Sequence, residues 1–274
     1  RAAGEWLLFT DSDTLHTLQS IARGVAQAEA LQVDLLSAMP RQITCGLGER
    51  IVVSFLLDFL PLIMLDLPSL ASGATTSRTV GNNTVGNSAA VGQYLLVRAE
   101  KYRAAGGHAA IAHNLVDDFA LAAHMRAAGS RMALVNGINM LACRMYRSPR
   151  EVWHGFSKNV LAALEMSTAS TRRRGWQLPF IWIYACVFLM PWYRLLFATP
   201  KLTALLEVVW LTALRAVVNR QFARPHSELL GTPLAAASVV AFSFNALLRR
   251  QRHKPVTWND RTYDVSEPES LRPD

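Results

Sequence analysis

Long apolar runs dominate residues 176–248, whereas residues 1–175 have the mixed composition of a globular domain. The whole chain of 274 residues is 51% hydrophobic, which is too apolar for an ordinary soluble enzyme. The uneven distribution predicts a globular part followed by a membrane region.

Three segments of the apolar third are candidates for membrane helices. Residues 178–199 are long enough to cross a bilayer, which takes about 20 residues. Residues 202–219 and 229–248 are weaker candidates, and Glu207 and Arg215 argue against a lipid-facing position for the first of these two. Three crossings would also place the basic residues after the last span against the positive-inside rule. The sequence therefore predicts two to three membrane helices without fixing their number.

The net charge of +8 comes with basic residues gathered beside the apolar third, including the run 172–174. Basic residues next to an apolar span are typical of the cytoplasmic flank of a membrane helix. This explanation accounts for the apolar third as well, whereas a nucleic-acid-binding module would explain only the charge. We therefore expect a membrane and not a nucleic acid as partner.

The three cysteines, Cys45, Cys143 and Cys186, show neither pair spacing nor a metal-ligand pattern. The sequence therefore carries no disulfide or zinc signal, and a reducing, cytosolic setting fits the polar part best.

An apolar run at residues 6–9 ends on two acids, Asp11 and Asp13. A run of this kind is typical of a central strand covered on both faces, and ligands of such sheets bind beyond the carboxyl ends of the strands. Paired carboxylates there, together with substrate phosphates, are the usual way of holding Mg²⁺ or Mn²⁺. The alternative is that either acid caps a helix, which the apolar spacing predicts over residues 15–32.

Further elements follow in alternation, so the sequence predicts an α/β fold. A second acidic pair, Asp117 and Asp118, begins a predicted helix that Gly129 ends. The other predicted elements are strands at 33–40, 94–97 and 131–141, a short helix at 100–105 stopped by Gly106 and Gly107, and a basic, aromatic helix at 144–164.

Four segments in this order resemble the motifs of membrane-associated family 2 glycosyltransferases with the GT-A fold. They are "FTDSDT" (metal motif), "GQYLLVRAEKYRAAGGH" (acceptor-side segment), "VDDFALAAHMRAAG" (acidic segment before a helix) and "MYRSPREVWHGFSKN" (membrane-proximal helix). Within that family the chain is most similar to bacterial enzymes that glycosylate carotenoid-type and hopanoid-type lipids, and "VTWNDRTY" resembles their ending.

The resemblance implies a GT-A-like mixed sheet flanked by helices, with its N-terminal part missing, in a catalytic domain of residues 1–165. Residues 166–274 then form a membrane region with a basic cytoplasmic tail. The implied activity is metal-dependent, inverting transfer of a sugar from a UDP-linked nucleotide-sugar to a lipid acceptor. The implied location is the cell inner membrane, as a multi-pass protein with a cytoplasmic catalytic domain.

The resemblance also assigns roles to residues. Asp13 would hold Mg²⁺ or Mn²⁺, Asp11 would touch the metal or the sugar hydroxyls, and Asp118 would be the general base. Asp117 would orient neighbouring groups. The predicted substrate-binding residues are Gly92, Gln93, Gly107, His108, Lys158 and Trp153. For several of these an ordinary structural role is the alternative: an edge amide for Gln93, a structural ring for His108 and interface packing for Trp153.

Two departures from the family pattern bear on function. The usual Glu-Asp pair is Asp117-Asp118 here, which keeps the second acid. The "QxxRW" motif of processive polysaccharide synthases is absent, with "GFSKN" in the corresponding region. The alternatives are a processive synthase, which this absence disfavours, and an inactive truncated membrane protein whose acids only cap helices.

Overall fold

The computed structural model describes residues 2–57, 78–80, 83–85, 90–112, 114, 116–169, 177–252, 256–258 and 261–263. These residues form two compact units, which we describe separately. The first unit comprises residues 1–44 and 57–145, and the second comprises residues 45–56 and 146–274. The first unit ends at Met145. The predicted domain boundary at residue 165 lies twenty residues later, within a helix of the second unit.

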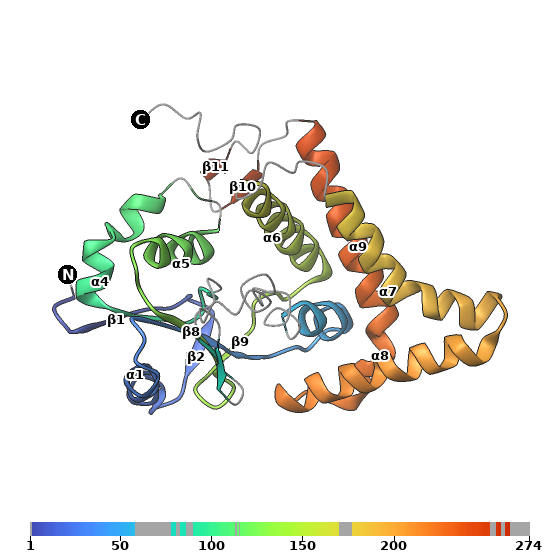
Figure 1. The fold of residues 1–274 in the computed structure, drawn as a ribbon, viewed down its shortest axis with the longest axis horizontal. Coiled ribbons are helices and arrows are strands. Elements are labelled where there is room, and N and C mark those ends of the chain that lie inside the picture. Colours follow the sequence, from blue (N-terminus) through green and yellow to red (C-terminus); the bar gives the residue numbers. More distant parts are fainter. Residues whose placement is uncertain are drawn as a thin grey trace. The chain divides into compact units, whose positions relative to one another are not determined.

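A six-stranded mixed sheet forms the centre of the first unit (Figure 1). Its strand order is β1-β7-β3-β8-β6-β5, in which β3 and β8 are parallel and the other neighbours are antiparallel. The strands are β1 (Trp6–Phe9), β3 (Leu35–Met39), β5 (Arg78–Val80), β6 (Asn83–Val85), β7 (Leu95–Arg98) and β8 (Met132–Asn136).

A smaller sheet has the order β2-β9-β4. Its strands β4 and β9 follow β3 and β8 along the chain, and β2 follows β1, so this sheet continues from the carboxyl ends of three strands of the larger one. The bounds are β2 (Thr14–His16), β4 (Arg41–Gln42) and β9 (Leu141–Cys143).

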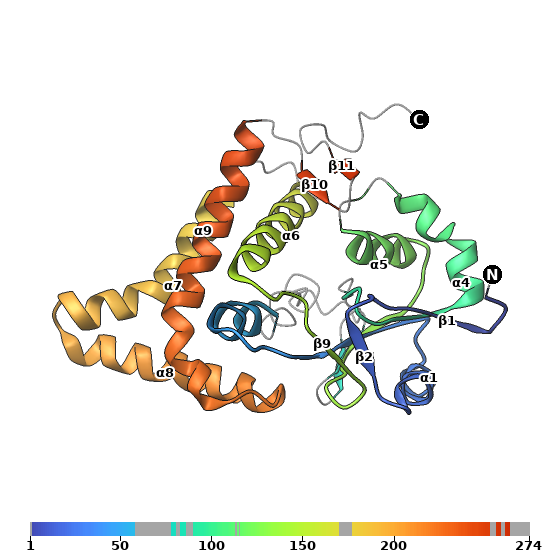
Figure 2. The ribbon, with the colours of Figure 1, turned by 180° about the vertical axis from the view of Figure 1, so that it is seen from behind.

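Helices cover both faces of the large sheet (Figures 1 and 2). Helix α1 (Ser20–Leu31) packs on one face, where Ala28 joins a cluster with Leu36, Leu96 and Val135. Helices α4 (Ala99–Ala104) and α5 (Asp117–Ala127), joined by the 3₁₀ helix η2 (Gly107–Ile111), lie on the other face. There Leu121 and Met125 of α5 are fully buried against the sheet. Central strands covered on both faces explain the continuous apolar runs of the sequence.

Most predicted elements are confirmed, but two predictions for the N-terminal region are wrong. Residues 6–9 do form strand β1, yet this strand lies at one end of the strand order and is only half-buried, so it is not a central strand. The helix predicted over residues 15–32 begins only at Ser20, because Thr14–His16 pair with Leu141–Cys143 as strand β2. Pairing with a distant strand overrides the local helical pattern.

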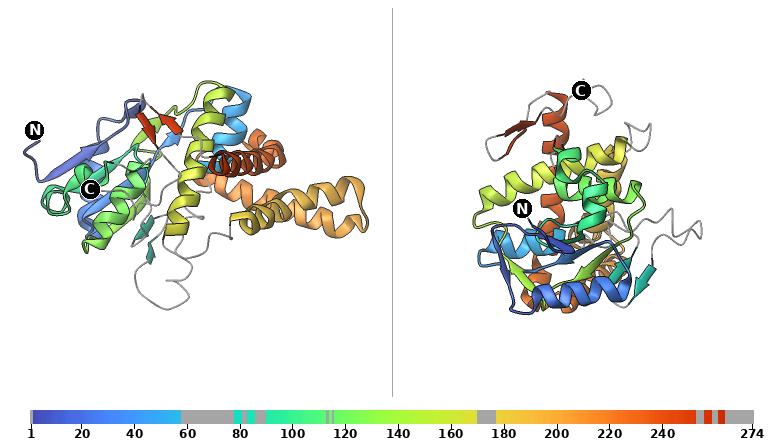
Figure 3. Two further views of the ribbon diagram at one scale, coloured as in Figure 1. Left: turned by 90° about the horizontal axis from the view of Figure 1, so that it is seen from above. Right: turned by 90° about the vertical axis from the view of Figure 1, so that its left-hand side faces the viewer.

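The second unit is helical, apart from a hairpin of β10 (Val256–Trp258) and β11 (Arg261–Tyr263). Helix α9 packs against α6 and α7, and α7 and α8 form an antiparallel pair (Figures 1 and 3). The other elements are η1 (Glu49–Val53, a π-helix), α6 (Pro149–Ala169), α7 (Gln177–Phe197), α8 (Lys201–Gln221), the 3₁₀ helix η3 (His226–Gly231) and α9 (Thr232–Gln251).

Two segments of this unit are long and apolar enough to cross a membrane, Lys201–Gln221 and His226–Arg249. The segment over residues 178–199 is predicted as the best span. Among the described residues, its apolar stretch is Trp182–Phe197, which is shorter than the other two segments. Length and composition alone are weak evidence for a membrane span. Many large apolar side chains are nonetheless exposed on α7, α8 and α9, among them Trp182, Phe197, Leu206, Trp210 and Phe244.

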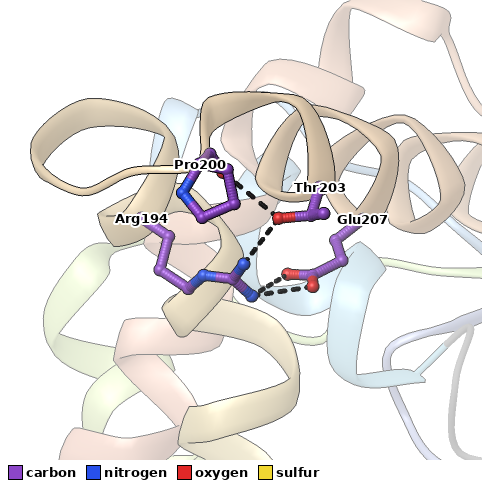
Figure 4. Close-up of polar contacts among 4 residues, drawn as sticks. All are labelled: Arg194, Pro200, Thr203 and Glu207. Carbon is purple, nitrogen blue, oxygen red and sulfur yellow. Dashed lines mark hydrogen bonds and ion pairs between the residues drawn. The ribbon is translucent and has the colours of Figure 1, made fainter.

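Two charged residues of α8, Glu207 and Arg215, are paired with charges on neighbouring segments. The Arg194 guanidinium donates to both carboxylate oxygens of Glu207, at 2.8 and 3.0 Å, and to the Thr203 hydroxyl at 2.7 Å (Figure 4). Arg215 and Glu228 are 1% and 4% exposed, with Nη2 and Oε2 3.8 Å apart. Glu207 and Arg215 therefore do not face lipid as bare charges.

The basic run 172–174 lies outside the described residues.

Candidate functional site

The register between β1 and β7 sets the geometry of the first acid pair. Phe9 pairs with Leu95, so the residues that follow β1 lie beside the residues that precede β7. Asp11 consequently lies close to Gly92: a Cβ atom built on Gly92 would be 3.7 Å from Asp11 Oδ1. Since β1 and β3 are both antiparallel to β7, this point is at the carboxyl ends of β1, β3 and β8. The position is the one that the sequence predicts.

Asp118, in the first turn of helix α5, reaches the same point. Its Oδ2 accepts a hydrogen bond from the Gly92 N–H at 2.8 Å, and its Oδ1 accepts one from the Phe119 N–H at 2.8 Å. The same Cβ built on Gly92 would be 3.4 Å from Asp118 Oδ2. Gly92 thus lies beside the carboxylates of both Asp11 and Asp118, each of which would be in ordinary van der Waals contact with a Cβ atom at this position.

The pKa of Asp118 is raised to about 7, and burial is the largest cause. The neighbouring carboxylates of Asp117 and Asp11 also contribute to the rise, while the N–H groups of Phe119 and Gly92 act in the opposite direction because they stabilise the charged form. A carboxyl group with a pKa near neutrality can take up and release a proton at physiological pH. This property suits a general acid or base.

Asp13 faces a buried thiol. Cys143 of β9 pairs with Thr14 across the small sheet, and its side chain hydrogen-bonds the Asp13 carboxylate. Burial raises the pKa of the Cys143 thiol, and the negative charges of Asp13 and Asp11 raise it further. The thiol therefore stays protonated and serves as a donor to Asp13 rather than as a nucleophile.

The structure also tests whether the acids are merely helix caps. Strand β2 follows Asp13 directly, and α1 begins only at Ser20 after an N-cap residue that makes no side-chain cap bond. Asp11 and Asp13 therefore cap no helix. Asp118 does lie in the first turn of α5, but its bond to Gly92 joins it to a second segment, which a purely local cap would not do.

Ser37 holds the Gly92 segment in place and is not evident from the sequence. Its buried hydroxyl accepts a hydrogen bond from the Val91 N–H at 2.8 Å and donates to the Val91 carbonyl at 3.2 Å. The feature of the sequence that could have indicated this role is a single serine inside an otherwise apolar strand. Gln93, the next predicted residue, is itself buried, and its carbonyl accepts a hydrogen bond from Thr10 at 3.0 Å.

Gly107 and His108 pack with aromatic rings beside β1. Gly107 adopts a φ of +59°, and a Cβ atom there would lie 2.6 Å from the Tyr102 ring. The Tyr102 hydroxyl contacts His108 Nδ1 at 2.7 Å and accepts from the His108 N–H at 3.0 Å. The ring of Phe9, two residues before Asp11, lies 4.7 Å from the His108 ring. These contacts give His108 a structural role, and its predicted contact with substrate stays a prediction.

Trp153 and Lys158 belong to the second unit. Trp153 is partly exposed on α6, with its ring 5.2 Å from that of Phe242 on α9. This contact gives Trp153 a packing role between two helices of the second unit. The alternative of packing at the membrane interface and the predicted substrate contacts of both residues stay predictions.

The donor set bears on whether Asp11 and Asp13 could hold a divalent ion. Within the described part of the chain, no three His, Cys, Asp or Glu side chains gather as a metal site. Two carboxylates in one turn fit Mg²⁺ or Mn²⁺ only if phosphate oxygens and water complete the coordination, which is common for these ions. The residues present fit a divalent ion that arrives with a phosphorylated substrate.

Comparison with known families identifies the class of protein. The model of glycosyl transferase family 21 matches residues 63–271, so the chain is a glycosyltransferase. The match covers more than half of the chain, and the chain therefore belongs to glycosyl transferase family 21. A comparison with curated proteins finds no match.

The match confirms the resemblance to glycosyltransferases at the level of the class. It does not confirm the finer resemblance to lipid-modifying family 2 enzymes. The matched range includes Gly92, Asp117 and Asp118 but begins after Asp11 and Asp13. The acid pair after β1 is therefore supported by its geometry alone.

Proposed function

We propose that this protein transfers a sugar from a UDP-sugar to a membrane lipid, with inversion at the anomeric carbon and with Mg²⁺ or Mn²⁺. In this proposal the first unit belongs to a GT-A-like catalytic domain on the cytoplasmic side of the cell inner membrane. The second unit anchors it through several membrane helices. Family membership supports the sugar transfer, and the further details rest on the site and on the apolar surface.

The observation that carries the proposal is the meeting of Asp11 and Asp118 at Gly92. Two carboxylates from different elements approach the backbone of one glycine, at the carboxyl ends of the strands, where ligands of such sheets bind. The pair Asp11 and Asp13 is suited to the diphosphate of a donor. The pair Asp117 and Asp118 is suited to the hydroxyl group of an acceptor.

On the donor side, Asp13 and Asp11 would hold the divalent ion together with the diphosphate. The ion, when bound, neutralises the negative charge that develops on the leaving diphosphate. Cys143 keeps the Asp13 carboxylate oriented through its thiol hydrogen bond.

On the acceptor side, Asp118 would take the proton of the acceptor hydroxyl. As that oxygen bonds to the anomeric carbon, the bond from carbon to the diphosphate oxygen breaks, and its electron pair leaves with the diphosphate. The Gly92 and Phe119 N–H groups orient the Asp118 carboxylate for this step. Asp117, next along the chain, raises the proton affinity of Asp118 by like-charge repulsion.

The choice of a lipid acceptor is supported by the second unit. Large apolar side chains are exposed along α7, α8 and α9, and two segments there could cross a membrane. Extended exposed apolar surface marks contact with a membrane or with another protein. A chain that joins such a surface to a transferase domain is suited to an acceptor that resides in the bilayer.

The first test is sugar transfer from radiolabelled UDP-sugars into the organic-extractable lipids of membranes that contain the full-length protein. The comparison includes Mn²⁺, Mg²⁺ and EDTA, and the variants Asp13→Asn and Asp118→Asn. We expect metal-dependent label in lipid and a loss of at least about a hundredfold in each variant, because each removes a charged group from the reacting centre.

Asp34→Asn is the matched control. Asp34 accepts a hydrogen bond from the Arg131 N–H, away from the Asp11 turn, so this variant should keep full activity. Activity that survives both Asp13→Asn and Asp118→Asn would contradict the proposed roles. Label in an insoluble polymer instead of lipid would favour a processive synthase.

A further inference from the structure

Four polar side chains form a hydrogen-bonded cluster directly behind the Asp11 turn. They are Thr10, Thr14, His16 and Ser20. His16 Nε2 lies 2.8 Å from Thr10 Oγ1 and 3.3 Å from Thr14 Oγ1, and His16 Nδ1 lies 3.3 Å from Ser20 Oγ. The two threonine hydroxyls lie 2.6 Å apart. The sequence pattern gives no role to these residues.

Counting hydrogens assigns the direction of the bond from the ring. The Thr14 hydroxyl donates to the Asp11 carbonyl at 2.6 Å, and the Thr10 hydroxyl donates to the Gln93 carbonyl at 3.0 Å. Each hydroxyl has only one hydrogen. When the two threonine hydrogens go to these carbonyls, neither is left for the contact with His16. We therefore assign the hydrogen of the contact between His16 and Thr10 to Nε2, which leaves Nδ1 to accept from the Ser20 hydroxyl.

The cluster joins the two halves of the candidate site. Through Thr14 it holds the backbone of Asp11, and through Thr10 it holds the backbone of Gln93. The residue before Gln93 is Gly92, whose N–H binds Asp118. One imidazole N–H thus supports the hydroxyl pair that sets the position of Asp11 relative to Gly92.

A buried tyrosine orients the imidazole. The ring of Tyr94, which is fully buried, lies 5.8 Å from the His16 ring, and its hydroxyl donates to the Ser20 carbonyl at 3.0 Å. Ser20 in turn faces His16 Nδ1. The ring is therefore fixed at both nitrogens and on one face, although the side chain as a whole is exposed.

We propose that His16 is a positioning residue, which holds the Asp11–Asp13 turn in the shape that binds a divalent ion and the diphosphate of the donor. The inference rests on the function proposed above. It assigns no contact between His16 and substrate. Partners of this kind behind a metal ligand typically change metal affinity by about 10-fold to 100-fold when they are removed.

The test compares His16→Ala and His16→Gln in the full-length, membrane-bound protein. A glutamine amide can donate from a position near that of Nε2, whereas alanine cannot. The measurements are Mn²⁺ binding in the presence of UDP, by electron paramagnetic resonance, together with the donor KM, kcat and the melting temperature. His154→Ala, at an exposed histidine of α6, is the matched control.

We expect His16→Ala to weaken Mn²⁺ binding and to raise the donor KM, each by about tenfold, with a smaller change in kcat at saturating metal and donor. His16→Gln should recover most of both losses, and His154→Ala should change neither. Equal impairment in the alanine and glutamine variants would mean a structural role only and would overturn the inference. So would unchanged Mn²⁺ binding in His16→Ala.

The outcomes separate this inference from the proposed function. If the wild-type protein binds Mn²⁺ with UDP but transfers no sugar, the proposed function fails, and weaker Mn²⁺ binding by His16→Ala alone still supports the positioning role. If the wild-type protein binds no Mn²⁺ in the presence of UDP, the positioning role is overturned as well.

Discussion

Asp118 combines a partly buried carboxyl group with two backbone N–H donors, and the balance between their opposing effects on its pKa determines when it carries a charge. Burial dominates, so its pKa rises from the ordinary value for Asp to about 7. The folded state therefore holds a proton that the unfolded chain would release. Linkage then requires the free energy of unfolding to decrease as the pH rises from about 4 to about 7.

This pKa predicts the pH dependence of catalysis. A general base must be unprotonated, so kcat/KM should fall about tenfold for each pH unit below 7. Asp117→Asn removes a neighbouring negative charge, so this acidic limb of the pH profile should move to lower pH. The shift should be smaller than the one that burial causes in the pKa of Asp118. Steady-state pH profiles check both statements, with Asp34→Asn as the control. A limb that does not move in Asp117→Asn would argue that Asp118 is not the titrating base.

At the scale of elements, helix α1 owes its close approach to the sheet to a single glycine. A Cβ atom on Gly24 would lie 2.1 Å from the Tyr94 hydroxyl oxygen, which donates to the Ser20 carbonyl one turn earlier in the helix. The missing side chain at Gly24 thus provides the space in which Tyr94 binds the start of α1. The same tyrosine lies beneath His16, so the packing of this helix and the shape of the Asp11 turn share one residue.

Gly24→Ala should therefore destabilise the fold by about 1–3 kcal/mol, the usual range for overpacking, although alanine is the better helix former. Tyr94→Phe in the same background should restore part of this loss, because the nearest ring atom would then be 3.0 Å from the added methyl group. Chemical denaturation of the two single variants and the double variant measures this coupling. Additive effects would show that the two side chains do not compete for this space.

The sequence alone predicted the elements whose signals are local. The acidic start and glycine end of α5, the glycine stop after α4, and the apolar strands β3, β7 and β8 are all confirmed. It also placed Asp11 correctly at the carboxyl end of a strand. It failed where pairing is non-local: strand β2 depends on β9, more than a hundred residues away, and the local pattern there favours a helix. The role of Ser37 escaped for the same reason, since its partner is Val91.

At the scale of the whole molecule, the two units differ in the surface that they expose. Large apolar side chains are exposed along the α7, α8 and α9 helices of the second unit, which includes both segments that could cross a membrane. The family match spans most of this unit, so the helices are part of what defines the family and not an appendage to it.

We expect the protein to remain with membranes after alkaline carbonate extraction, and the double variant Leu206→Lys/Trp210→Lys to be released in part. Both side chains are exposed on α8, and charged side chains on a lipid-facing surface are costly. Ile21→Lys places the same charge at an exposed apolar site of the first unit and should leave retention unchanged. Full retention of the α8 variant would indicate that this face does not contact lipid.

The pairing of Arg194 with Glu207 has a consequence for how the chain is made. During synthesis α7 emerges before α8, and the carboxylate that neutralises its arginine follows thirteen residues later. Until then Arg194 is an unpaired cation, which hydrocarbon disfavours, whereas the closed pair lowers that cost. If both helices enter the bilayer as proposed above, α7 should therefore insert together with α8, as one hairpin.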